Sequence, residues 1–184
     1  PDESVDLAIM LVGPAMKEHY REDSIVYCYR AFCKSSCPTN EEIKQITVMH
    51  DIVMVGYPNG LIDEAHMMPV CRRGMIATSP LLNFNGERAF LIDIACTPGS
   101  SGSPVIAYDS IWEKLENGQL RKTDQARLIG IFSEGNTTIA QGATISNNSN
   151  TSQPVAVRFP YGIGKVIKFE CLDDFVPLLE KLCK

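Results

Sequence analysis

The residue types that could do chemistry gather in one short segment, T-P-G-S-S-G-S-P-V at residues 97–105. A serine hydroxyl becomes an effective nucleophile for acyl transfer when a base lies beside it and donors face the oxyanion that forms. Gly99 and Gly102 permit backbone angles that other residues disfavour, so the N–H groups of Gly99 and Ser101 can point into one small space. Pro104 suits a chain that leaves a turn into a strand. We therefore predict Ser101 as the nucleophile and the N–H groups of Gly99 and Ser101 as an oxyanion hole.

The same letters also occur in ordinary surface loops, because Gly, Ser and Pro are typical turn residues. Here the segment joins two apolar runs, residues 89–95 and 105–107, and such runs are typical of buried strands. A loop held between buried strands favours the catalytic interpretation over a plain turn.

Several segments, taken in chain order, resemble trypsin-like serine peptidases of the chymotrypsin fold. Asp6 in S-V-D-L-A-I-M resembles the triad aspartate of that family, which directly precedes an apolar strand. The G-S-S-G-S-P around Ser101 resembles the family's G-D-S-G-G-P loop, and G-I-F-S-E-G at residues 130–135 resembles its substrate-binding strand G-I-V-S-W-G. The segments V-G-Y-P-N-G-L at 55–61 and R-R-G-M-I-A-T at 72–78 resemble the second-barrel hairpin of bacterial-type members.

The resemblance implies a triad in the order His, Asp, Ser, with the histidine about 40 residues before the start of this chain. The three histidines present, His19, His50 and His66, all follow Asp6 and so do not fit that order. We therefore expect Asp6 and Ser101 to be the catalytic residues here, and the chain to be an N-terminally truncated piece that is inactive without an upstream histidine.

Four further residues take substrate-binding roles by the same resemblance. Ser133, Glu134 and Gly135 lie in the strand that binds the substrate backbone. Ala95 corresponds to the base of the pocket for the residue before the scissile bond, where trypsin has an aspartate. Ala95 argues against a preference for Lys or Arg and favours small or apolar side chains. Glu134 has two interpretations that stay open, a groove residue with negative character or a solvated turn residue.

The function that these residues predict is a serine endopeptidase acting on peptide or protein substrates. The alternative is a catalytically inactive, protease-like module that binds extended peptides along residues 130–135 by strand addition. A structural domain in which the loop is only a turn is a third possibility.

Composition limits the other classes of function. A net charge of -5 argues against a nucleic-acid surface, and no apolar run approaches the roughly 20 residues that cross a bilayer. Seven cysteines are present, and the cluster Cys28, Cys33 and Cys37 lacks the spacing of a zinc site. We therefore expect no metal and no cofactor. The odd number of cysteines favours free thiols in a soluble protein of the cytoplasm or of a prokaryote.

The elements that must position the site are short strands separated by turns, which indicates an antiparallel β-barrel or sandwich. With the resemblance, the expected fold is an all-β, chymotrypsin-like double barrel with the second barrel complete and only the end of the first present. The strands of the second barrel are expected at 46–55, 70–78, 89–94, 105–108, 128–133 and 164–169.

Four regions follow from this organisation. Residues 1–33 are expected to end the first barrel with strands at 6–12 and 24–32, and residues 34–45 to be an inter-barrel linker. Residues 46–169 are expected to form the second barrel, including a flexible loop at 146–153, and 170–184 a C-terminal helix. The helix expectation rests on apolar residues at helical spacing, with Pro177 tolerable only near the first turn.

Overall fold

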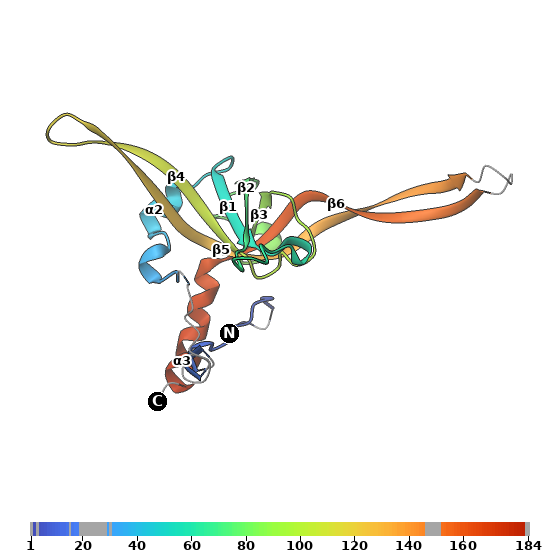
Figure 1. Cartoon of the computed structure of the whole chain (residues 1–184), viewed down its shortest axis with the longest axis horizontal. Helices are drawn as coiled ribbons and strands as arrows, with labels where there is room; N and C mark the ends of the chain where they lie inside the picture. The colour runs from blue at the N-terminus through green and yellow to red at the C-terminus, as the bar shows by residue number, and fades with distance from the viewer. Residues whose placement is uncertain are drawn as a thin grey trace.

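Six antiparallel strands close into a barrel. The computed structural model describes residues 2, 4–14, 16–18, 29, 31–145 and 152–182. The strands pair in the order β1-β2-β3-β6-β5-β4, and β1 also pairs with β4 (Figure 1). Because the first and last strands of this order pair with each other, the sheet closes on itself. The strand bounds are β1 (Asp51–Gly56), β2 (Val70–Ile76), β3 (Ala89–Asp93), β4 (Pro104–Lys114), β5 (Leu120–Ile145) and β6 (Ser152–Lys168).

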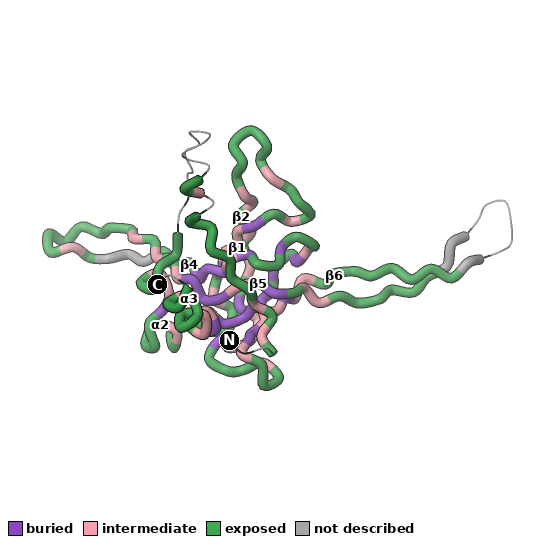
Figure 2. The backbone as a smooth tube through the Cα atoms, turned by 90° about the horizontal axis from the view of Figure 1, so that it is seen from below, coloured by how far each residue is buried: buried purple, intermediate pink, exposed green. Residues whose placement is uncertain are grey.

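The core lies inside the barrel, where alternate side chains of each strand point inward. Ile52 and Met54 of β1 and Phe90 and Ile92 of β3 are fully buried. Figure 2 shows buried backbone gathered at the centre and exposed backbone along the projections. Full burial of one such side chain contributes about 1.5–3 kcal/mol to folding. The cluster is completed by Ile46, Ile76, Ile94, Cys96, Val105, Ala107, Ile129, Phe132 and Val166.

Two long hairpins extend from the barrel on opposite sides (Figure 1). One joins β4 to β5 as far as the pair Lys114 and Leu120, and the other joins β5 to β6 as far as Ile145 and Ser152. The predicted strands 105–108 and 128–133 are therefore too short. Outside the barrel, each strand of an arm pairs only with the other strand of the same arm. The arms therefore lack the runs of buried residues from which strands are predicted in a sequence. Of the predicted loop 146–153, residues 146–151 lie outside the described residues, and β6 begins at the remaining two.

The predicted linker 34–45 contains two short helices, η1 (Lys34–Ser36) and α2 (Asn40–Gln45). The side-chain hydroxyl of Thr39 accepts a hydrogen bond from the N–H of Glu42, and the carboxylate of Glu42 accepts one from the N–H of Thr39. This reciprocal pair is a capping box, whose T-x-x-E signature begins a helix. These two helices were not predicted, although the T-x-x-E signature indicates the start of α2.

The C-terminal helix is confirmed, and it begins with a tighter turn. A 3-10 helix, η4 (Phe169–Phe175), leads into α3 (Val176–Leu182), with Pro177 in the first turn as expected. An ion pair of 2.6 Å between Arg88 Nη1 and Asp174 Oδ2 ties this segment to the barrel. Two further 3-10 turns are η2 (Pro58–Gly60) and η3 (Phe84–Gly86). None of the helices in the described ranges is long and apolar enough to cross a membrane.

The N-terminal segment differs from its prediction. Residues 6–12 contain no strand, and most of their side chains are exposed. Each barrel strand already pairs with two others, and the part of β5 that lacks a β4 partner, residues 133–135, forms no backbone hydrogen bond with residues 6–12. The predicted strand 24–32 lies almost wholly outside the described residues. The mostly β, antiparallel architecture with a C-terminal helix is confirmed.

Candidate functional site

The segment 97–103 is a tight loop that leads into β4 at Pro104, and its two glycines have the backbone angles that the sequence predicted. Gly99 and Gly102 have φ of +81° and +83°. A Cβ on Gly99 would lie 2.7 Å from the carbonyl oxygen of Tyr57. The N–H of Asn59 also donates to the carbonyl of Pro98 at 2.6 Å. The loop is thus packed against η2, and its closest approach requires a glycine.

The backbone N–H groups of this loop alternate between bound and free. The N–H of Ser100 donates to the carbonyl of Thr97 at 3.1 Å, and the N–H of Gly102 donates to the carbonyl of Phe132 at 2.8 Å. Among the described residues, the N–H groups of Gly99 and Ser101 have no hydrogen-bond partner. Two unpaired donors next to a serine hydroxyl are what an oxyanion hole requires.

Ser133 of β5 lies between the two predicted catalytic residues. The exposed Ser101 donates from Oγ to the carbonyl oxygen of Ser133 at 2.5 Å. The Oγ of Ser133 in turn donates to Oδ2 of Asp6 at 3.0 Å. Ser133 itself is 7% exposed. Asp6 is therefore held beside the nucleophile loop although its segment forms no strand.

Arg72 of β2 forms hydrogen bonds with the nucleophile loop and with the residue that precedes Cys96. This role of Arg72 was not predicted. Its Nη1 donates to the carbonyl of Ala95 at 2.6 Å, and its Nη2 donates to Oγ of the fully buried Ser100 at 3.0 Å. Burial lowers the pKa of the Arg72 guanidinium, whose Nε is buried without a partner. Period-two alternation could have found this residue, because it puts Arg72 on the same face as the buried Ile76.

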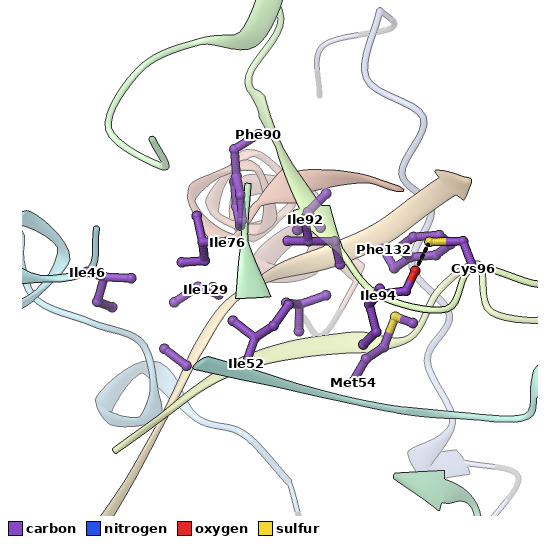
Figure 3. Packing of buried hydrophobic residues seen from close by; sticks show 13 residues of the cluster. Ile46, Ile52, Met54, Ile76, Phe90, Ile92, Ile94, Cys96, Ile129 and Phe132 are labelled. Carbon is purple, nitrogen blue, oxygen red and sulfur yellow. Dashed lines mark hydrogen bonds between the residues drawn. The ribbon is translucent and has the colours of Figure 1, made fainter. Parts of the chain in front are cut away.

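A groove with a volume of about 320 Å³ opens beside Ser101. Cys96 lines this groove, whereas Ala95 is exposed and does not. Cys96, one position after the predicted Ala95, therefore lines the groove in its place. Figure 3 shows the reason, since Cys96 points inward beside Phe132 and its thiol donates to the carbonyl of Ile94 at 3.1 Å. The groove is lined by Cys96, Thr97, Pro98, Ser101, Phe132, Glu134, Gly135, Thr137, Arg158 and Pro160.

Two glycines make room for the Cys96 side chain, which lines this groove. A Cβ on Gly135 would lie 2.6 Å from Cβ of Cys96, and one on Gly164 would lie 2.7 Å from the Cys96 thiol. The predicted residues Glu134 and Gly135 both line the groove, while Ser133 contributes through its hydrogen bonds. The Oε1 of Glu134 accepts from Nζ of Lys165 at 2.8 Å, so Glu134 is a groove residue with an ion-pair partner.

The two histidines that the structure describes lie beside other aspartates. His50 Nε2 lies 3.3 Å from Asp109, and His66 Nδ1 lies 2.9 Å from Asp63. His50 precedes β1 at the end opposite Gly56, and it is Gly56 that lies against Ser103 of the nucleophile loop. His19 lies outside the described residues. Neither described histidine forms a hydrogen bond with Ser101.

The described cysteines are all free thiols: Cys33, Cys37, Cys71, Cys96 and Cys171. Hydrogen bonds from the Ser35 and Ser36 side chains lower the pKa of the Cys33 thiol to about 7. In the described part of the chain, no three of the His, Cys, Asp and Glu side chains are grouped so that they could hold a metal ion.

Comparisons of the chain with protein-family models, with curated proteins and with solved structures each found no match. The case for a function therefore rests on the residues and their geometry.

Proposed function

We propose that this chain carries the aspartate and the nucleophile of a serine endopeptidase, with Ser101 as the attacking residue. The observation that carries the proposal is the connection of Asp6 to Ser101 through Ser133. The two unpaired N–H groups of Gly99 and Ser101 support it, because they supply the donors that an acyl-transfer site needs. We further propose that the barrel is the second of two, with the end of the first within residues 1–33.

The reaction needs a base that the described histidines do not supply at Ser101. In the proposal this base is a histidine N-terminal to Asp6, whose carboxylate orients the imidazole ring. The imidazole takes the Ser101 proton as Oγ bonds to the peptide carbonyl carbon. The C–N bond then breaks, the amine leaves with that proton, and water releases the acyl group as a carboxylate by the same steps.

The strand next to the nucleophile has an edge that could hold an extended substrate. β4 begins at Pro104, which pairs with Ile131, so in the described structure residues 133–135 have only β6 as a neighbouring strand. Ser101 Oγ donates a hydrogen bond to the Ser133 carbonyl in this arrangement. A substrate N–H could donate to that carbonyl instead, which would free the Ser101 hydroxyl for attack.

The test uses the complete protein and a fluorophosphonate probe, which reacts readily only with an activated serine. We expect labelling at Ser101, none in Ser101→Ala, and unchanged labelling in Ser110→Ala, which removes an exposed hydroxyl from β4. Asp6→Asn should lower kcat by about 10⁴-fold. Full hydrolysis of a peptide by Ser101→Ala would show that the assignment is wrong.

The alternative proposal is an inactive module that binds extended peptides along residues 133–135. The free side of β5 favours it, and it needs no base. Absence of labelling in the complete protein, together with peptide binding that survives Ser101→Ala, would support this alternative.

A further inference from the structure

Arg158 is the only charged residue in the sequence between Glu134 and Lys165. This stretch includes the arm that β5 and β6 form outside the barrel. Because the arm contains no acidic residue, no carboxylate of the arm can neutralise the positive charge of Arg158. The surface that Arg158 faces therefore receives an uncompensated positive charge.

Arg158 faces the groove beside Ser101. It lies opposite Ile139 in the register of β5 and β6, and it shares a strand face with Pro160, which is paired with Thr137. Arg158, Pro160 and Thr137 all line the groove, as Ser101 does. The groove is thus lined both by the proposed nucleophile and by a guanidinium from the arm.

The guanidinium of Arg158 is not engaged by any described residue. Four other arginines bind carbonyl, hydroxyl or carboxylate groups in the described structure: Arg72, Arg73, Arg88 and Arg127. Arg158 forms no ion pair or side-chain hydrogen bond with any described residue. Its five donors are available to a ligand.

The other charged residue of the groove is already paired. Glu134 binds Lys165 through Oε1 at 2.8 Å, and Lys165 also binds Glu87, which does not line the groove. The remaining walls include Cys96, Phe132, Pro98 and Pro160. The groove therefore combines apolar walls with one unpaired cation, which suits a side chain with methylene groups and a terminal anion.

We propose that the groove beside Ser101 selects substrates with a carboxylate, Glu or Asp, before the scissile bond, and that Arg158 is the residue that recognises it. The planar guanidinium binds a carboxylate through two parallel hydrogen bonds, which a neutral amide reproduces poorly. This inference rests on the proposed peptidase function. It replaces the preference for small or apolar side chains that Ala95 suggested.

The test compares peptides that differ only in Glu, Gln or Lys before the scissile bond. The complete protein should cleave the Glu peptide with kcat/KM about 10- to 100-fold above the Gln peptide, the range of one charge-assisted hydrogen bond. Arg158→Gln should bring the ratio to about one, and Arg158→Glu should shift the preference to Lys. Lys122→Gln, which removes a cation from the other arm, should leave the ratio unchanged. Equal kcat/KM for Glu and Gln in the unaltered protein would overturn the inference.

Two controls separate this inference from the peptidase proposal. Fluorophosphonate labelling of Arg158→Gln should equal that of the unaltered protein, since Ser101 is not changed. If labelling fails in all variants, binding of the same peptides to Ser101→Ala by fluorescence anisotropy tests the carboxylate preference without catalysis. Peptides with an amidated C-terminus distinguish a side-chain carboxylate from the terminal one. Glu and Gln peptides that bind equally to Ser101→Ala would refute recognition by Arg158.

Discussion

Ser133 Oγ donates a hydrogen bond of 3.0 Å to Oδ2 of Asp6, a residue 127 positions earlier in the chain. The carbonyl oxygen of the same Ser133 accepts from Ser101 Oγ. One buried residue of β5 therefore touches Asp6 and Ser101, the two members of the proposed triad that this chain carries.

Ser133→Ala should release Asp6 while leaving the backbone carbonyl that Ser101 binds. We expect the rate of fluorophosphonate labelling of the complete protein to fall about 10-fold, because one charge-assisted hydrogen bond is lost. In an Asp6→Ala background the same substitution should have no further effect, since the partner is already absent. Additive losses in the double variant would show that Ser133 acts independently of Asp6.

Gly99→Ala should disrupt the nucleophile loop more than Gly102→Ala. Both positions have positive φ, which costs a non-glycine residue about 1–2 kcal/mol. At Gly99 the new Cβ would also lie 2.7 Å from the Tyr57 carbonyl oxygen, whereas at Gly102 no atom lies within 4 Å. We expect urea unfolding to show an additional loss of about 1–3 kcal/mol for Gly99→Ala. Equal losses at the two sites would mean that the contact with η2 does not constrain the loop.

Arg72→Met should destabilise the protein, and Arg73→Met should change its stability little. Arg72 holds Ala95 and Ser100 from the inner face of β2, and its loss leaves the buried Ser100 without that donor. The cost should be about 2–3 kcal/mol, the range for hydrogen bonds to charged groups. Arg73 is the next residue but faces outward to an exposed ion pair with Asp51.

Unfolding in urea gives the two free energies, and hydrogen exchange at the Ser103 amide reports on the loop. Exchange should accelerate in Arg72→Met alone, because Ser103 N–H donates to the Ser100 carbonyl within the supported loop. Equal exchange in both variants would contradict a supporting role for Arg72.

Glu42 should make stability depend on pH in the acid range. The N–H of Thr39, followed by the Arg127 guanidinium, lowers the pKa of Glu42 from 4.5 to about 2. Because the folded pKa lies below the unfolded one, the ionised carboxylate stabilises the fold above about pH 4.5. That contribution is lost as the pH falls toward about 2.

Glu42→Gln keeps an acceptor for the Thr39 N–H but removes the charge. The urea midpoint of this variant should fall less steeply between about pH 4.5 and 2 than that of the unaltered protein. Glu41→Gln, at an exposed pair with Lys44, is the control and should retain the steeper fall. Identical slopes for Glu42→Gln and the unaltered protein would contradict the assignment.

Local features of the site were predictable from the sequence because they depend on short-range backbone preferences. The loop at 97–105, the positive φ of Gly99 and Gly102, and the approximate positions of β2 and β3 follow from glycine, proline and two-residue alternation. The capping box of Thr39 and Glu42 marks the start of α2 in the same local way.

The sequence by itself therefore determined which loop carries the candidate nucleophile and that the chain is mostly β. The tertiary structure decided that Asp6 meets Ser133, that Arg72 supports Ser100, that Cys96 rather than Ala95 lines the groove, and that Arg158 reaches it. These contacts join residues far apart in the chain, so they depend on strand register and barrel closure. A shift of one residue in register turns a side chain to the opposite face, and no local preference specifies that choice.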